Sequence, residues 1–266
     1  MANGLYVASS GSRAQLDRLE TVSNNLANLM TSGFKRQEAT YAEVHNDVSS
    51  IGSPDQAMGV RTPNRFLPED RVRVELSDRY TSWAQGNLDQ TDNPLDLAIE
   101  GNGLFKVKDE TGNVFYTRHG QFQLGPTGTI SNQSGLEILG INNAPIRVPA
   151  TQGRLDIAYD GRVSVGEQQL GQIDVVTIGK GSGSEINRAM THVGEGLYRL
   201  DDDTAVVNKA NGLVRQGFME GSNVNAVTEM MSLLSASRLF DLNQQAAKAM
   251  GEMDSQAAKD VALVQG

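Results

Sequence analysis

Two stretches near the ends of the chain carry apolar side chains at alternating intervals of three and four residues. Residues 12–32 and 222–250 contain neither glycine nor proline. This spacing places the apolar side chains on one face of an α-helix. The pattern therefore predicts a helical arm at each end of the chain.

The first arm is predicted to begin at an Asn3 cap and to stop at Gly33, which can adopt the left-handed conformation that follows many helices. A heptad spacing runs along it, interrupted by two polar residues in the middle. Its positions are Leu5, Ala8, Ser12, Gln15, Leu19, Val22, Leu26 and Leu29.

The last arm is predicted to begin after Asn225, with Glu229 in the first turn. Its apolar positions are Val227, Met231, Leu234, Leu239, Leu242, Ala246, Ala249, Met253 and Ala257. At 1.5 Å per residue, such a helix approaches roughly 55 Å. A single striped helix is usually ordinary core, but two arms too long for the middle of the chain to cover favour helix-on-helix assembly.

Between the arms, the hydrophobic period changes to two, which is typical of strands. We expect strands over 104–108, 114–117, 121–124, 173–178 and 197–200. Ile157 and Tyr159 are predicted to face Val163 and Val165 across a type I′ turn at Asp160-Gly161. The fold class is therefore mixed, with an all-β central domain, an antiparallel barrel or sandwich, between two helical arms.

The chain is accordingly divided into four parts: an N-terminal arm over 1–33, an extended connector over 34–80, a β-rich central domain over 81–221 and a C-terminal arm over 222–266. The connector is polar, contains Pro54, Pro63 and Pro68, and fits neither the helical nor the strand period. We expect it to be extended, with an order that depends on a partner.

Composition excludes several classes of function. The 266 residues carry 23 basic and 32 acidic side chains, for a net charge of −9, so nucleic acid is not an expected partner. There is no cysteine, which excludes disulfides and thiolate chemistry. No apolar run reaches the roughly 18 residues that span a bilayer, and the N-terminus does not have the pattern of a secretory signal. Membrane insertion is therefore not expected.

The chemistry-bearing residues do not form a recognisable site. His45, His119 and His192 have no partner at metal-ligand spacing, and the glycine-rich 179–184 lacks the P-loop pattern. The acidic run 201–203 is interpreted as a solvated turn. No catalytic residue, metal site or cofactor is predicted, and an enzyme is not expected.

Six blocks of the sequence, rich in asparagine, glycine and apolar residues, lie at 24–28, 31–36, 85–88, 93–105, 116–122 and 216–225. In sequence and in order, these blocks resemble those of the flagellar rod, hook and hook-associated axial proteins. The resemblance implies a structural, motility-related subunit of the bacterial flagellar basal body, whose terminal helices pack as a coiled-coil-like core in a hollow rod. It also implies self-association, contacts with proximal and distal rod subunits, a rod location in the periplasm, and type III export without a cleaved signal through contact with the export apparatus.

Within this family, the sequences at 3–7 and 219–224 resemble proximal-rod members, and a distal-rod or other hook–basal-body subunit is the alternative. Less favoured alternatives are a wall-binding module, which needs a deep polar pocket, and a wall hydrolase, which needs two carboxylates facing one another in a cleft.

The resemblance also favours a register role for three amides on the first arm, Asn24, Asn25 and Asn28, against a simple polar face in water. Buried amides of a misaligned neighbour would be left unpaired. The predicted subunit interface is Leu5, Leu19, Val22, Asn24, Asn25, Leu26, Asn28, Leu29, Val227, Met231, Leu234, Leu239, Leu242, Ala246, Ala249 and Met253.

Overall fold

The computed structural model describes residues 2–45, 72–149, 154–179, 181–201 and 205–264. These residues form two compact units. The first lies within Met1–Asn24, Glu38–Arg79 and Val227–Gly266, and the second within Asn25–Gln37 and Tyr80–Ala226. The middle of the predicted connector lies outside the described residues, and the four-part division of the chain stays a prediction.

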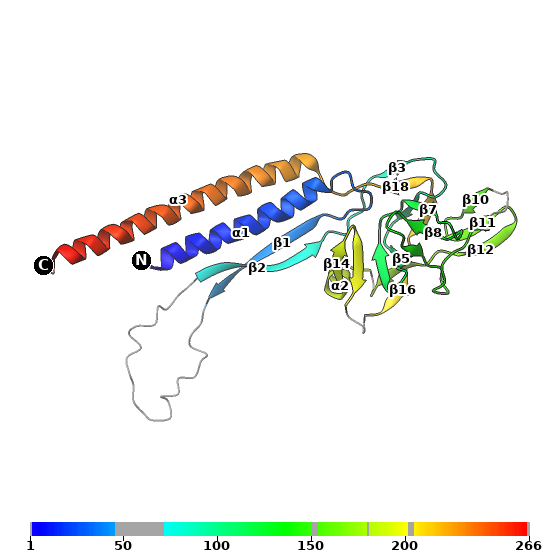
Figure 1. Cartoon of the computed structure of the whole chain (residues 1–266), viewed down its shortest axis with the longest axis horizontal. Helices are drawn as coiled ribbons and strands as arrows, with labels where there is room; N and C mark the ends of the chain where they lie inside the picture. Colours follow the sequence, from blue (N-terminus) through cyan, green and yellow to red (C-terminus); the bar gives the residue numbers. More distant parts are fainter. Residues whose placement is uncertain (1, 46–71, 150–153, 180, 202–204, 265–266) are drawn as a thin grey trace, which may run out of the picture. The chain divides into compact units, whose positions relative to one another are not determined.

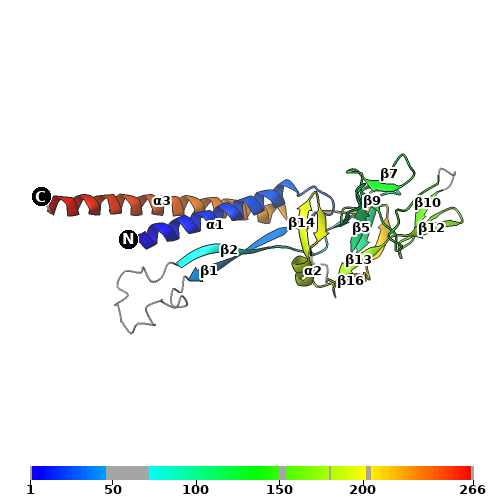
Figure 2. The same ribbon diagram turned by 60° about the horizontal axis from the view of Figure 1, so that its bottom comes forward.

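The first unit contains the two predicted helices, which are confirmed. Helix α1 spans Ala2–Ala27 and α3 spans Ala226–Val264, and they run side by side (Figures 1 and 2). A Cβ built on Gly11 of α1 would lie 3.2 Å from Nδ2 of Asn243, so the side chain of this α3 residue packs closely against Gly11.

The ends of the connector form strands that its polar sequence did not predict. Strand β1 (Gln37–His45) and strand β2 (Val72–Thr81) form a two-stranded sheet in which the hydroxyl of Thr40 donates to the carbonyl of Asp78. The backbone N–H of Val74 donates to Oγ of Ser10 on α1 at 3.5 Å. These strands therefore pack against α1 within the same unit.

The helix ends place one predicted cap residue at the expected position and correct two other assignments. Asn225 immediately precedes α3, as predicted. Helix α1 already includes Asn3, so that residue lies inside the helix and does not cap it. The helix ends at Ala27, well before Gly33, so Gly33 is not its stop. Gly33 is left-handed, with φ +67°, for a different reason, which the contacts of the second unit explain.

The second unit is built from short antiparallel strands and one short helix, α2 (Gly183–Ala189). The strands are β3 (Leu88–Gln90), β4 (Leu97–Glu100), β5 (Leu104–Lys108), β6 (Val114–Thr117), β7 (Phe122–Leu124), β8 (Ile130–Asn132), β9 (Glu137–Ile138), β10 (Leu155–Ile157), β11 (Arg162–Val165), β12 (Gln168–Gln172), β13 (Val175–Ile178), β14 (Met190–Gly194), β15 (Leu197–Leu200), β16 (Val207–Lys209), β17 (Leu213–Gln216) and β18 (Phe218–Glu220). The β-rich centre between two helices is confirmed.

The predicted barrel is wrong, because the largest sheet of the described residues stays open. Its strand order is β14-β15-β6-β5-β9-β8-β7, with β13 joined to β5 and β16 joined to β13. Along one edge of β5, Leu104 and Phe105 pair with β13 whereas Val107 and Lys108 pair with β9. Among the described residues, the terminal strands β14, β7 and β16 do not pair with one another, so this sheet does not close on itself. Smaller sheets pair β10-β11-β12, β17-β4 and β18-β3.

The core of the second unit gathers apolar side chains from most of these strands. Phe105 and Phe122 meet edge to face with ring centroids 5.6 Å apart. Around them lie buried aliphatic residues, among them Leu97, Ile99, Val107, Ile130, Ile138, Val163, Ile173 and Val214. The alternation seen in the sequence therefore reports the inward face of these strands.

The predicted hairpin near residue 160 is present, but its turn type is corrected. Leu155 pairs with Val165 and Ile157 with Val163. Gly161 has φ +84°, whereas Asp160 is not left-handed, so the turn is not type I′. The N–H of Gly161 donates to the carbonyl of Ala158 at 2.8 Å. A type I turn followed by a left-handed glycine fits this pattern, and it places Tyr159 in the turn and not in the strand.

Replacing Gly161 with valine should lower the free energy of unfolding by about 1–3 kcal/mol. A β-branched residue is strained at positive φ, and a Cβ at this position would lie 3.1 Å from the carbonyl oxygen of Ile173. Urea unfolding of the two proteins measures the difference. Gly166→Val is the control for backbone strain alone, since Gly166 is also left-handed but has no atom within 4 Å of its Cβ position. Unchanged stability of Gly161→Val would contradict the turn assignment.

Candidate functional site

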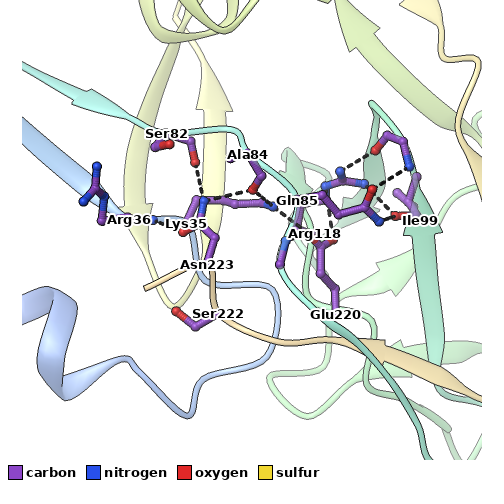
Figure 3. Close-up of polar contacts among 12 residues, drawn as sticks. Lys35, Arg36, Ser82, Ala84, Gln85, Ile99, Arg118, Glu220, Ser222 and Asn223 are labelled. Atoms are coloured by element: carbon purple, nitrogen blue, oxygen red, sulfur yellow. Dashed lines mark hydrogen bonds and ion pairs between the residues drawn. The ribbon is translucent and has the colours of Figure 1, made fainter. Parts of the chain in front are cut away.

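Three charged side chains from distant parts of the sequence meet in the interior of the second unit (Figure 3). Nζ of Lys35 lies 2.6 Å from Oε1 of Glu220, and both side chains are 0% exposed. Nε of Arg118, on a side chain that is also buried, lies 3.4 Å from Oε2 of the same glutamate. We call Lys35, Arg118 and Glu220 the junction cluster.

Backbone geometry brings Lys35 to this place. The N–H of Gly33 donates to the carbonyl of Glu220 at 2.7 Å, and the hydroxyl of Ser32 donates to the same oxygen at 3.1 Å. A Cβ on Gly33 would lie 2.6 Å from the carbonyl carbon and oxygen of Arg118. Glycine is therefore required at position 33 both by its left-handed φ and by the close approach of another segment.

Lys35 and Glu220 also bind the segment that follows β2. Nζ of Lys35 donates to the carbonyl of Ala84 at 2.8 Å, and the backbone N–H of Gly86 donates to Oε1 of Glu220 at 3.0 Å. The Cβ position of Gly86 lies only 2.1 Å from the carbonyl oxygen of Gly221. A side chain at position 86 would therefore push this segment away from the glutamate.

The guanidinium of Arg118 extends the network to the end of β4. Its Nη1 and Nη2 atoms donate to the carbonyls of Ile99 and Gly101 at 3.3 and 2.5 Å. The side chain of Gln85 bridges the same turn, because its Nε2 donates to Ile99 and its Oε1 accepts from the N–H of Gly101. These bonds hold the guanidinium of Arg118 in place beside Glu220.

Asn223 closes the same region from the C-terminal side. Its Oδ1 accepts from the N–H of Arg36 at 2.7 Å, and its Nδ2 donates to the carbonyls of Ser82 and Ala84 at 2.8 and 2.9 Å. Residues 33–36, 82–86 and 220–223 are therefore held together by side chains that bond to the backbones of other segments.

The electrostatics of the cluster are unbalanced, with two cations and one carboxylate in a buried space. Burial lowers the pKa of Lys35, although attraction to Glu220 opposes the shift and repulsion from Arg118 adds to it. Burial likewise lowers the pKa of Arg118 against the attraction of Glu220. The single carboxylate thus stabilises two desolvated cations, and its removal would leave both without a counter-charge.

The predicted register amides lie in different environments. Asn25 is 1% exposed, and its side chain exchanges two hydrogen bonds with the backbone of Gln37, both at 2.9 Å. Asn24 is exposed on α1, and Oδ1 of Asn28 accepts from the hydroxyl of Thr31 at 3.2 Å. Asn25 thus has a role inside its own chain, and contact of any of the three with a neighbouring subunit stays a prediction.

The apolar face predicted on the C-terminal arm is exposed on α3. Val227, Met231, Leu234, Leu242 and Met253 are each 58–68% exposed. With a helical turn of 3.6 residues, these positions share one face with the exposed Ala249. The half-exposed Leu239 and the partly buried Ala246 lie at the flank of this face. Ala236, on the opposite side of the helix, is fully buried.

The predicted positions on the first arm, which is α1 and the turn after it, are more covered. Val22 is buried, and Leu19, Leu26 and Leu29 are partly buried. Leu5 lies in α1, but its side chain is outside what the structure describes. The first arm therefore uses part of its stripe within its own chain, whereas the α3 face is left to solvent.

The other chemistry-bearing candidates are not brought together. Burial lowers the pKa of His119 and of His192, with Asp96 opposing the shift at His119. Among the residues that the structure describes, no three metal-ligating side chains gather, and no helix is both long and apolar enough to cross a membrane. Lys180 and two residues of the acidic run, Asp202 and Asp203, lie outside the described part of the chain.

Sequence reasoning missed the junction cluster. Lys35 and Glu220 are 185 positions apart, and neither spacing nor periodicity links them. The sequence offered one indication. Lys35, next to Gly33-Phe34, and Glu220, within Phe218–Gly221, are charged residues in blocks rich in glycine and apolar residues, where burial is expected.

Three family models match this chain. "Flagella basal body rod protein" matches residues 5–35, "Flagellar hook protein FlgE/F/G D1 domain" matches residues 98–165, and "Flagellar basal body rod FlgEFG protein C-terminal" matches residues 215–260. Each matched region contributes one member of the junction cluster, namely Lys35, Arg118 and Glu220.

Curated relatives match almost the whole chain. "Flagellar basal-body rod protein FlgG" of Buchnera aphidicola subsp. Acyrthosiphon pisum is 30% identical over 95% of this chain and 97% of its own length. The FlgG of Bacillus subtilis is 29% identical over 91% of this chain and 93% of its own length. "Flagellar basal-body rod protein FlgF" of Mesorhizobium japonicum is also 29% identical, over 91% of this chain and 90% of its own length.

Proposed function

Because this chain belongs to the flagellar basal-body rod protein family, and is thus a structural subunit of the rod, we propose that the exposed face of α3 is its main contact with neighbouring subunits. The observation that carries this proposal is the row of large apolar side chains, 58–68% exposed, along Val227, Met231, Leu234, Leu242 and Met253. Burying one such side chain fully stabilises by about 1.5–3 kcal/mol, so even half of that at five positions gives several kcal/mol before ordering costs.

The face is suited to packing against another helix. From Val227 to Leu234, and again from Leu242 to Met253 through Ala246 and Ala249, its apolar residues recur every three or four positions. This spacing lets side chains of one helix insert between those of a second. We infer coiled-coil-like packing with other copies of this chain and with other axial subunits. A contact of this head-to-tail kind, repeated with a rotation that does not close, generates a helical tube.

The place along the rod is proposed to be proximal. The passages at 3–7 and 219–224 support this proposal, whereas relatives named FlgG and FlgF match at 30% and 29% identity and do not separate the two subunits. The wall-binding and wall-hydrolysing alternatives are not favoured by these relatives' names. We also propose a periplasmic location and type III export through contact with the export apparatus, both as the family resemblance implies. Localising a tagged chain in purified basal bodies would test the proximal position.

Replacing Met231 and Leu234 together by aspartate should abolish rod incorporation and motility while the melting temperature stays within a few degrees of wild type. Both side chains are exposed in the single chain, so the charges disturb its fold little, but they would be buried without partners between subunits. Motility in soft agar, electron microscopy of basal bodies and circular-dichroism melts of the purified chain measure these effects.

The matched control is Gln244→Asp with Ser255→Asp, which adds the same charge to exposed polar positions of α3 away from the apolar face. This control should assemble normally. Complete basal bodies in the Met231→Asp/Leu234→Asp strain would show that the face lies against solvent in the rod.

A further inference from the structure

The junction cluster belongs to the same unit as the chain segments that lead to both helices. Asn25–Ala27, the last turn of α1, and Gly221–Asn225, the residues that lead into α3, belong to the same compact unit as the cluster. Lys35 follows the first segment closely, and Glu220 directly precedes the second. The cluster therefore selects the arrangement of the two backbone segments from which the helices continue.

Each charge of the cluster reaches an atom on a different segment. Lys35 bonds to Glu220 and Ala84, whereas Arg118 bonds to the carbonyl of Gly101 and faces Glu220. If the segment that carries any one of these charges were shifted by one residue, at least one buried charge would lose its partner. Apolar side chains impose no such condition, because dispersion contacts tolerate small displacements far better than buried charges do.

We propose that the junction cluster is an orientation lock, which selects a single arrangement of residues 25–37 and 220–225 within the second unit and adds little to that unit's stability. Two observations support the second half of this statement. Both cations are buried, and among the described residues each pairs with the same single carboxylate. Buried ion pairs of this kind are often matched or exceeded in stability by apolar residues of similar volume.

The consequence for assembly rests on the proposed function. Subunits in a helical lattice must present their helices in one orientation, because an error at one subunit is repeated at every contact. If residues 220–225 were held loosely, the apolar face of α3 would stay intact. The direction in which α3 continues from these residues would then vary from subunit to subunit. The lock would therefore act on assembly without touching a neighbouring subunit.

The test is a charge-free cluster, Lys35→Met/Arg118→Met/Glu220→Gln, made in the full-length chain. Glutamine is chosen for the third position because its amide oxygen retains an acceptor for the N–H of Gly86. We expect a melting temperature within a few degrees of wild type, together with at least about tenfold faster hydrogen exchange at the amides of Gly33 and Gly86, and loss of rod incorporation. The emission of Trp83, the only tryptophan of the chain, reports on the same segment.

Neutralising the exposed pair Glu100–Arg215 with glutamines is the matched control, since it removes an ion pair of 2.6 Å outside the interior. A charge-free cluster that melts far below wild type would overturn the proposal, because the charges would then be needed for stability. The proposal would also be overturned if hydrogen exchange at Gly33 and Gly86 were unchanged in the charge-free variant. The same holds if exchange were faster but the variant still formed normal rods. Normal assembly of the Met231→Asp/Leu234→Asp variant would overturn only the proposal about the α3 face, so the two proposals are tested separately.

Discussion

Replacing Glu220 with glutamine should lower the free energy of unfolding of the second unit by about 3–5 kcal/mol. The substitution keeps the shape of the side chain and an acceptor for Gly86, but it leaves Lys35 and Arg118 buried without a counter-charge. The effect is large for a shape-conserving change because one carboxylate serves two buried cations.

Urea unfolding followed by the emission of Trp83 measures this effect, because that residue lies beside Ala84, whose carbonyl accepts from Lys35. Glu100→Gln is the control. Glu100 pairs with Arg215 at 2.6 Å, but both side chains are partly exposed, so its loss should lower stability far less than the loss of Glu220. Similar losses in the two variants would show that the cluster is solvated.

Replacing Gly120 with alanine should be almost as disruptive, for a steric reason. A Cβ at this position would lie 1.6 Å from the carbonyl oxygen of Leu97, a backbone atom at the start of β4. The N–H of Leu97 also donates to the carbonyl of Gly120 at 2.8 Å, so the two backbones cannot separate without losing that bond. We expect a loss of about 3 kcal/mol or more, the range of severe overpacking.

Urea unfolding of Gly120→Ala beside Gly171→Ala measures this loss. Gly171 also has no left-handed φ, and its nearest foreign atom is 3.9 Å from the Cβ position, so alanine there should change stability by less than about 1 kcal/mol. Wild-type stability of Gly120→Ala would mean that the β4 backbone moves freely away from residue 120.

The strands most accurately predicted from sequence are those with local partners. The expected strands over 104–108 and 114–117 coincide with β5 and β6, and that over 197–200 coincides with β15. In the β5–β6 hairpin, the turn residues lie next to the strands that they join, so the pairing is visible in a short window of sequence. The connector strands β1 and β2 were not predicted, because their partners are separated by a long intervening segment.

Turn chemistry was only partly readable. Asp160-Gly161 predicted a hairpin, and the pairing of Ile157 with Val163 confirmed it. The same two residues fit both a type I′ turn and a type I turn with a left-handed glycine, and only the backbone angles of the folded chain distinguish them. Gly33 was likewise recognised as a left-handed residue, but the contact that requires it, the backbone of Arg118, lies in another segment.

The sequence by itself determined the helical arms, the β-rich centre, the membership of the rod family and the apolar face of α3, because each of these follows from local periodicity or from contiguous blocks. Only the tertiary structure decided that the sheet is open, that Asn25 bonds within its own chain, and that Lys35, Arg118 and Glu220 share one buried space. The physical reason is that a buried charge is satisfied by whichever partner the fold brings within about 3 Å, and residues 185 positions apart carry no local sign of that pairing.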